Sequence, residues 1–192
     1  SPDQAWQLLW TEAQSQMDTM DLRLAYALAL QDWFVDLLVR QSSLHVQDVL
    51  VLAWDAQTNC TRPAGSRVNV RPMSVDDLPQ VCEVDSLAFE REWRNSPEAL
   101  RMALGEASVA TIAELDNQVI GYQISTGNPI GGHLARLAVR PAYQGQGVGT
   151  ALVGSLLEAF VARGVYRVTV NTQTNNQASL AIYRKSGFQS TG

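Results

Sequence analysis

The spacing of apolar and polar positions in the first third of the chain is typical of helices in some stretches and of a strand in another. Apolar residues at helical spacing predict helices over residues 4–17 and 31–40, and Asp3 can cap the first of them. The apolar and β-rich stretch 46–54 predicts a strand. The segment 22–30 fits a strand as well as a helix, so its structure is left open.

The pattern is lost between Asp55 and Arg67, where Gln, Thr, Asn, Pro, Gly and Ser residues gather. This composition is typical of a loop that connects two folded parts. We therefore predict a linker there and a boundary near residue 66. It separates an N-terminal segment, 1–66, from a second domain, 67–192.

From residue 67 the pattern becomes regular and predicts the order β-α-α-β-β-β-α-β-α. The predicted elements are 68–72, 74–89, 96–105, 108–114, 119–125, 133–139, 149–163, 166–171 and 176–185. The segment Leu115–Gln118 is a hairpin signal, so the strands beside it should pair antiparallel. The last two strands are joined by a helix, which makes them parallel. The predicted fold class is therefore α/β (α+β) with a mixed sheet.

Composition indicates a globular, acidic chain. Hydrophobic residues make up 46% of the sequence and charged residues 17%, with a net charge of −5 and a pI of about 5.0. This balance is that of an ordinary folded domain. A chain this acidic has no general electrostatic reason to bind nucleic acid, so no nucleic-acid partner is expected.

Several features predict a cytoplasmic protein without metal or membrane contact. No apolar run approaches the roughly 20 residues of a membrane helix, and the start lacks the basic stretch of a signal peptide. It also lacks an initiator Met, so we expect a trimmed chain or a piece of a longer protein. Cys60 and Cys82 are not spaced as metal ligands and should be reduced thiols, while His45 and His133 are too few for a zinc site.

The most informative stretch is Gln144-Gly145-Gln146-Gly147-Val148-Gly149, which follows a predicted strand and opens an apolar helix. Glycines at alternate positions let the backbone turn tightly, with no Cβ between it and a ligand. The first N–H groups of a helix have no intrahelical partner, and such a helix start suits a diphosphate. The alternative is a glycine-rich helix start that binds nothing.

Three phosphate-binding patterns can be compared with this loop. A Walker A loop needs Gly-Lys-Ser/Thr, and the loop has no lysine. A dinucleotide fingerprint needs Gly-x-Gly-x-x-Gly, but the sixth position counted from Gly145 is Thr150. The third pattern, Gln/Arg-x-x-Gly-x-Gly/Ala, is that of the GNAT acetyltransferases. Residues 144–149 match it at every defined position.

A second segment carries the same likeness. Asn176-Gln177-Ala178-Ser179-Leu180-Ala181-Ile182-Tyr183-Arg184-Lys185-Ser186-Gly187-Phe188 resembles the GNAT segment in which Asn precedes a helix bearing Ala, then Tyr, then Gly-Phe. Residues 67–192 are thus similar to the GNAT superfamily, most specifically over 134–188. The chain looks most like the ribosomal-protein and N-terminal acetyltransferases. The resemblance implies a central mixed sheet with helices on both faces.

The resemblance also implies acetyl-CoA as cosubstrate, with no metal, in a V-shaped gap between the strands 133–139 and 166–171. Backbone groups of Leu137 and Val139, on either side of Ala138, would pair with the pantetheine arm like an added strand. Asn176 would contact the cofactor arm. The implied loop residues around the diphosphate are Gln144, Gly145, Gln146, Gly147, Val148, Gly149 and Thr150.

Tyr183 is implied as the catalytic residue, which protonates the leaving thiolate after an amine attacks the thioester directly. Helical spacing alone would favour a core-facing aromatic ring. Asn176 also suits a helix N-cap, and the two roles are compatible. The general base is left open, because Asn171 stands where some relatives have Glu. The candidates are Glu83, Asp85, Glu90, Glu92, His133 and a water chain.

The order of elements in residues 1–66 resembles the back half of a GNAT domain without its motifs. We therefore expect a fragment of a tandem-GNAT protein, in which 1–66 is the remnant of a degenerate first copy. The strand 46–54 would then support the sheet of the second domain. An unrelated helical extension is the alternative.

The predicted function is acetyl transfer from acetyl-CoA to a primary amine of a small molecule, a lysine or a protein N-terminus. The acidic balance favours a cationic acceptor, and a homodimer is left open. One alternative is an acyl-CoA-binding sensor or regulatory domain without turnover. Another is a fold kept only for contacts with a partner.

Overall fold

The computed structural model describes residues 2–23, 25, 27, 29, 31–40, 43, 47–56 and 68–191. The chain forms two compact units, Ser1–Gln47 and Asp48–Gly192. His45, Cys60 and most of the predicted linker lie outside the described residues. Among the described helices, none combines the length and hydrophobicity that crossing a bilayer requires.

The first unit contains two helices, α1 (Pro2–Thr19) and α2 (Asp32–Arg40), where the apolar spacing predicts them. The Trp6 ring meets Phe34 edge-on with 5.8 Å between ring centroids, and Leu37 is buried. The described residues of the open segment 22–30 form neither helix nor strand.

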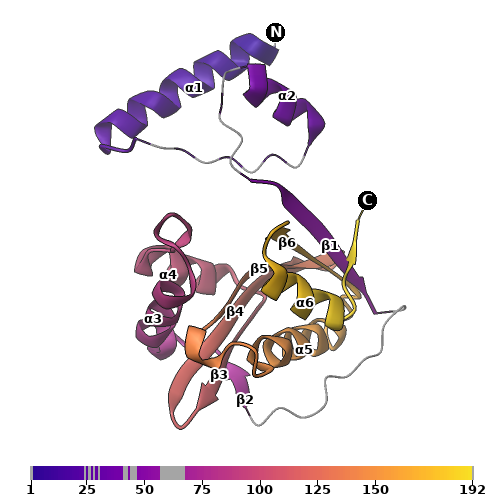
Figure 1. The fold of residues 1–192 in the computed structure, drawn as a ribbon. Coiled ribbons are helices and arrows are strands. Elements are labelled where there is room, and N and C mark those ends of the chain that lie inside the picture. Colours follow the sequence, from indigo (N-terminus) through magenta and orange to yellow (C-terminus); the bar gives the residue numbers. More distant parts are fainter. Residues whose placement is uncertain are drawn as a thin grey trace. The chain divides into compact units, whose positions relative to one another are not determined.

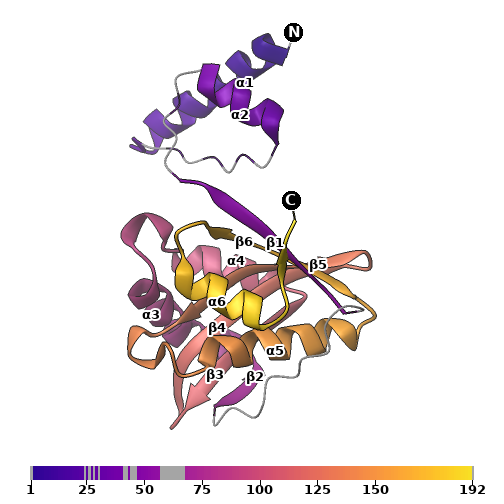
Figure 2. The ribbon, with the colours of Figure 1, turned by 45° about the vertical axis from the view of Figure 1, so that its right-hand side comes forward.

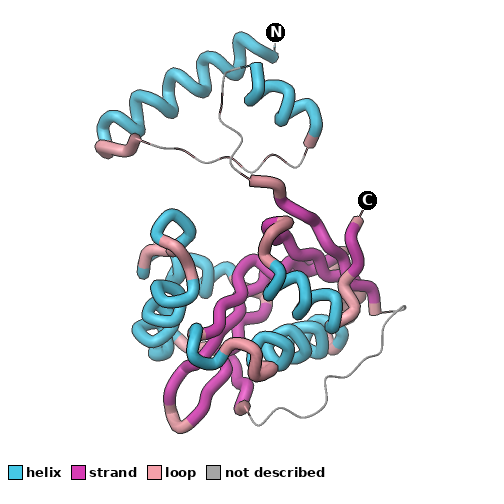
Figure 3. Tube along the Cα trace, viewed as in Figure 1, coloured by secondary structure: helices cyan, strands magenta, loops and turns pink. Residues whose placement is uncertain are grey.

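The second unit is built on a sheet with the strand order β2-β3-β4-β5-β6-β1-β7. Its strands are β1 (Val49–Asp55), β2 (Asn69–Pro72), β3 (Val109–Leu115), β4 (Gln118–Asn128), β5 (Gly131–Val139), β6 (Arg167–Gln173) and β7 (Gln189–Ser190). Strands β5 and β6 pair parallel and the other neighbours antiparallel. Figure 3 colours the strands of this sheet magenta. The predicted mixed sheet is confirmed.

Helices cover both faces of this sheet (Figures 1 and 2). On one face lie α3 (Leu78–Ala88) and α4 (Pro97–Glu106), and on the other α5 (Val148–Val161) and α6 (Gln177–Lys185). Three short 3-10 turns, η1 (Val75–Asp77), η2 (Arg91–Trp93) and η3 (Pro141–Tyr143), lead into or connect these elements.

Local signals account for several of these boundaries. The Ser96 hydroxyl accepts the Ala99 N–H at 3.1 Å and caps α4, with Pro97 in the first helical position. Asp116 and Asn117 both have positive φ, 50° and 62°, as the two-residue turn between β3 and β4 requires. The predicted hairpin is therefore confirmed.

Strand β1 comes from the segment before the predicted linker and adds to the far side of β6. It pairs antiparallel from Val49↔Gln173 to Asp55↔Arg167, and it buries Leu52 in the core. The expected support of the sheet by this strand is confirmed. The boundary between the two compact units lies between Gln47 and Asp48, before β1. The boundary expected from the sequence, near residue 66, lies after β1. The origin of residues 1–66 in a first GNAT copy stays a prediction.

The last described element is a strand that the sequence pattern did not predict. Strand β7 pairs with β1 through Leu52↔Ser190 and Ala53↔Gln189. Two residues are too few for a period-two pattern to be recognised. This strand forms because β1 offers an open edge beside it.

Candidate functional site

A gap opens between β5 and β6 towards their C-terminal ends. The two strands pair from Gly132↔Val168 to Leu134↔Val170. Beyond that point β5 continues beside β4 as far as Val139, while β6 continues beside β1. The two strands therefore part inside one sheet, which is the V-shaped arrangement that the sequence resemblance implied.

Every second residue of β5 directs its backbone N–H and C=O groups towards this gap. The Arg140 N–H donates to the Ile120 carbonyl at 2.8 Å, so Arg140 faces β4. Because amide direction alternates along a strand, Ala138 also faces β4, whereas Leu137 and Val139 face the side of the gap. The last two are the residues expected to pair with the pantetheine arm.

The glycine loop leads from the end of β5 into α5 with its donors exposed. Gly145 and Gly147 have φ of 73° and 84°, and the first intrahelical bond runs from the Ala151 N–H to the Gly147 carbonyl at 2.9 Å. Among the described residues, no hydrogen-bond partner exists for the backbone N–H groups from Gly145 to Thr150. The chain is exposed over 144–147. This run of donors beside a helix start suits an anion.

The other side chains of the loop hold its shape. The Gln144 amide donates to the Val139 carbonyl at 3.1 Å, and the Gln146 amide donates to the Ala142 carbonyl at 2.9 Å. Val148 is buried and Thr150 is half-buried. Both glutamines thus close local turns through their side chains, while the loop amides point outward.

Helix α6 lies on the same side of the sheet as α5 and starts at Asn176. The Asn176 side-chain oxygen accepts the Ser179 N–H at 3.1 Å, and its amide nitrogen lies 3.5 Å from the Gln173 side-chain oxygen. The N-cap role predicted for Asn176 is therefore confirmed. Its contact with the cofactor arm stays a prediction.

Tyr183 belongs to the core beneath α5 and α6. It is 4% exposed, its ring centroid lies 5.7 Å from that of Phe188, and the same cluster contains Leu134, where the gap begins. Burial raises the pKa of the Tyr183 hydroxyl to about 12, and a hydrogen bond with Ser179 opposes that rise. The hydroxyl is therefore protonated at neutral pH and can donate a proton.

Two of the carboxylates considered as bases are already engaged. Glu83 lies 2.8 Å from the guanidinium of the buried Arg140, which lowers the pKa of Glu83. Asp85 is 1% exposed and lies 2.7 Å from Arg136. Of the others, Glu90 and Glu92 are exposed, and Asn171 is half-buried opposite Val51.

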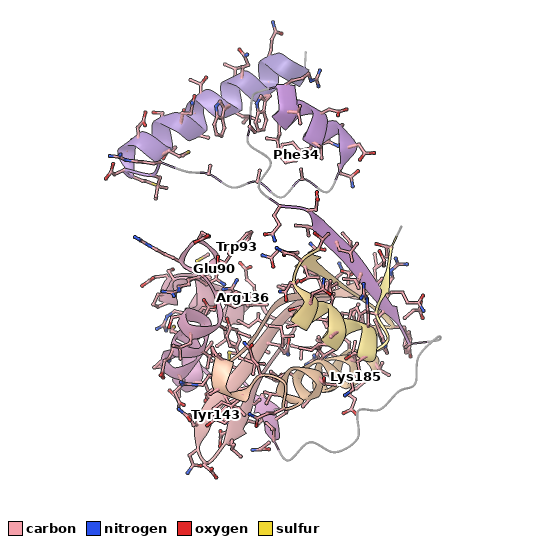
Figure 4. The ribbon with its side chains drawn as sticks, in the orientation of Figure 1. Phe34, Glu90, Trp93, Arg136, Tyr143 and Lys185 are labelled. Atoms are coloured by element: carbon pink, nitrogen blue, oxygen red, sulfur yellow. The ribbon has the colours of Figure 1, made fainter. Side chains whose placement is uncertain are left out.

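A buried network around Asp85 was not predicted. Its carboxylate accepts hydrogen bonds from the Tyr122 hydroxyl, from Arg136 at 2.7 and 2.9 Å, and from the Asn95 N–H at 2.9 Å. Arg136 also donates to the Trp93 carbonyl at 2.6 Å, so η2 is tied to β5; Figure 4 labels both residues and Glu90. No sequence signal could have found this network, because Asp85 and Arg136 are 51 residues apart.

Comparisons with known proteins agree with this geometry. The acetyltransferase (GNAT) family model matches residues 74–188. N-alpha-acetyltransferase 30 of Schizosaccharomyces pombe is 31% identical over 127 residues, which cover 63% of this chain and 83% of that protein. Its sequence is therefore a distant relative of this one.

Two crystal structures share the fold. The GCN5-related N-acetyltransferase from Sphaerobacter thermophilus has a TM-score of 0.72 at 20% identity, covering 97% of this chain and 64% of that one. The ribosomal-protein-S18-alanine N-acetyltransferase from Escherichia coli has a TM-score of 0.60 at 23% identity, covering 65% of this chain and 79% of that one.

The family match extends over more than half of the chain and includes the glycine loop, the N-cap Asn176 and Tyr183. The fold agrees with it, through the splayed strands, the unpaired loop amides and the helices on both faces of the sheet. The chain therefore belongs to the GNAT acetyltransferase family, with distant similarity to N-alpha-acetyltransferases and to ribosomal-protein alanine acetyltransferases.

Proposed function

We propose that this chain transfers the acetyl group of acetyl-CoA to a primary amine by direct attack on the thioester. The GNAT family uses acetyl-CoA. The observation that carries the proposal is the run of unpaired N–H groups from Gly145 to Thr150, beside the gap between β5 and β6. Unpaired N–H donors at a helix N-terminus carry partial positive charge, which attracts an anionic diphosphate.

In this proposal the chain binds the cosubstrate mainly through its backbone. The amides from Gly145 to Thr150 hold the diphosphate, with Gln144 and Gln146 fixing the loop. Leu137 and Val139 face the gap and pair with the pantetheine arm, as an added strand would. Ala138 faces β4 instead, so its part is to keep the strand in register.

Tyr183 acts as the general acid in this proposal. Its hydroxyl is protonated at neutral pH because burial raises its pKa to about 12, and the ring is fixed by packing against Phe188. A fixed proton donor is what a thiolate leaving group requires. The support is the family motif together with the burial of Tyr183 in the same hydrophobic cluster as Leu134, the residue of β5 at which the gap begins.

The acceptor we propose is the α-amino group of a protein or peptide N-terminus. The relative from Schizosaccharomyces pombe is named an N-alpha-acetyltransferase, and the structure from Escherichia coli is named for an alanine of a ribosomal protein. The net charge of −5 also favours approach of a cationic amine.

A thiol-release assay tests the proposal. The chain is supplied with acetyl-CoA and a panel of peptides with free N-termini, lysine-containing peptides and small amines. We expect free thiol to appear with free N-terminal peptides. The same peptides acetylated at the N-terminus serve as matched controls and should give none.

Calorimetry with coenzyme A separates the alternatives. Binding without thiol release from any acceptor would indicate a sensor or regulatory domain. Failure to bind coenzyme A would contradict the proposal and favour a fold kept for partner contacts.

A further inference from the structure

His133 lies on the opposite face of the sheet from Tyr183. Its neighbours on β5 both point to the α5 side: a Cβ placed on Gly132 would lie 2.7 Å from Phe160, and Leu134 is buried in the cluster that contains Tyr183. Because side chains alternate along a strand, His133 points to the face that carries α3 and α4. It is half-buried there.

Beside His133 this face is hollowed. A hollow of about 510 Å³ is lined by Thr126, Gly127, Asn128, Ile130, Gly131, Gly132, His133, Arg167 and Thr169. His133 pairs with Thr169 one step before β5 and β6 part at Leu134↔Val170. The hollow therefore adjoins the closed end of the gap and has room for an amine-bearing group.

The imidazole of His133 is oriented by a hydroxyl. Its Nδ1 lies 2.9 Å from Thr169 Oγ1, and that hydroxyl donates a long bond of 3.4 Å to the Gly132 carbonyl. A hydroxyl that donates its one hydrogen to a carbonyl accepts from its other neighbour. In the tautomer that donates from Nδ1 to the Thr169 hydroxyl, Nε2 is the basic nitrogen.

The surroundings keep this nitrogen unprotonated. Burial lowers the pKa of His133 below its usual value of 6.5. Among the described residues that line the hollow, the charged side chain is Arg167, and none is a carboxylate. His133 is therefore neutral at pH 7 and able to accept a proton.

We propose that His133 is the general base for the acceptor amine, an inference that rests on the proposed acetyl transfer. The amine nitrogen forms a bond to the thioester carbonyl carbon, and the C–S bond breaks with its electron pair left on sulfur. One N–H proton passes to His133 Nε2, and the thiolate takes the Tyr183 phenol proton. Solvent then returns the proton from His133 to Tyr183.

Two features of the sheet support these roles of His133 as base and Tyr183 as acid. The acid and the base lie on opposite faces, and the gap between β5 and β6 is the place where the sheet opens between them. An amine can thus approach from the His133 side while the thiolate stays on the Tyr183 side. A base on His133 also accounts for the absence of one at Asn171, because the Asn171 amide cannot accept a proton at neutral pH.

The test is the pH dependence of kcat/KM for a free N-terminal peptide. The wild-type chain should show two acid limbs, one near the pKa of the peptide amine at about 8, which every variant shares, and a second with a midpoint below pH 6.5 that belongs to His133. His133→Gln should lose the second limb and fall about 100-fold in rate at pH 7. Its affinity for coenzyme A should remain. The matched control is His45→Gln, which should keep both the rate and the second limb, since His45 is the other histidine of the chain.

A second measurement does not depend on the folding of His133→Gln. In the His45→Gln chain the remaining imidazole can be titrated by NMR, and its midpoint should coincide with that of the second acid limb. Two different midpoints would assign the limb to another group. An unchanged rate and profile in His133→Gln would also overturn the inference. Absence of thiol release from the wild-type chain would instead overturn the proposed function itself.

Discussion

A Cβ atom placed on Gly149 would lie 2.7 Å from Cδ1 of Ile182, so this glycine lets α5 approach α6 closely. A Cβ on Gly145 or Gly147 would meet no atom within 4 Å, but both residues have positive φ. The loop motif therefore meets two separate needs, a left-handed turn at its first two glycines and close helix packing at its third.

We expect the two kinds of glycine to respond differently to alanine. Gly149→Ala should lower the free energy of unfolding by about 1–3 kcal/mol, because the Ile182 side chain must move. Gly147→Ala should cost about 1 kcal/mol for the left-handed backbone, yet weaken coenzyme A binding more, because it turns the loop amides away. Urea unfolding and calorimetry check the pair. If both variants changed stability and coenzyme A affinity equally, the separate roles of Gly149 in packing and Gly147 in the loop would be contradicted.

Tyr183→Phe should keep the fold and the cofactor site while slowing turnover. The phenyl ring retains the packing against Phe188 and loses only the hydroxyl. We expect kcat to fall about 100-fold and the affinity for coenzyme A to stay within a factor of two, since general acid catalysis is worth roughly this much. Because the pKa of Tyr183 is raised to about 12, its ionisation should add no alkaline limb below about pH 11. Unchanged kcat would remove Tyr183 from the reaction.

The Asp85 network should show strong coupling in a double-mutant cycle. Arg136→Met leaves a buried carboxylate without its cation and should cost about 3 kcal/mol of unfolding free energy. Asp85→Leu combined with Arg136→Met should recover part of that loss, because no charge then remains buried. Urea unfolding of the wild type, both single variants and the double variant gives the coupling. If the unfolding free-energy changes of the two single variants simply add in the double variant, the ion pair is not the source of the lost stability.

The stability of the second unit should depend on pH through Asp77. Hydrogen bonds from Arg71 at 2.8 and 2.9 Å lower the pKa of Asp77 from 3.8 to about 2. A carboxylate with a depressed pKa stabilises the fold above its unfolded value near 3.9, and that contribution is lost as pH falls from about 4 to 2. Asp77→Asn should therefore cost about 1–2 kcal/mol at pH 7, a reduced figure because Arg71 is partly exposed.

The measurement is the unfolding free energy of Asp77→Asn and wild type at several values of pH. Their difference should shrink between pH 4 and pH 2. Asp76→Asn is the matched control, since Asp76 is an exposed neighbour in the same turn. A difference that does not change with pH would mean that Asp77 contributes through packing alone.

Most elements of the second unit could be predicted from the sequence, because their signals are local. Ser96 and Pro97 mark the start of α4, and Asp116-Asn117 marks a hairpin. The pattern of the stretch 46–54 also predicts a strand, but no local signal identifies β6 as its partner. Strand β7 was missed because two residues carry too little pattern.

The residues of the candidate site also fall into two groups, those that the sequence predicts and those that it does not. The glycine loop and Tyr183 could be found from spacing, since each lies in a continuous motif. The occupation of Glu83 and Asp85 by Arg140 and Arg136 could not, because neither arginine is near its partner in sequence. Two of the carboxylates considered as bases were thus excluded by contacts that no motif encodes.

The order of residues alone is enough to predict the conformations that short stretches prefer, such as the left-handed glycines before α5 and the cap of α6 at Asn176. Those preferences depend on neighbouring residues alone. Packing in three dimensions establishes that β1 pairs with β6, that Asp85 is neutralised by Arg136, and that His133 and Tyr183 face opposite sides of the sheet. These outcomes depend on strand order, register and side-chain direction, which are set when distant segments pack together.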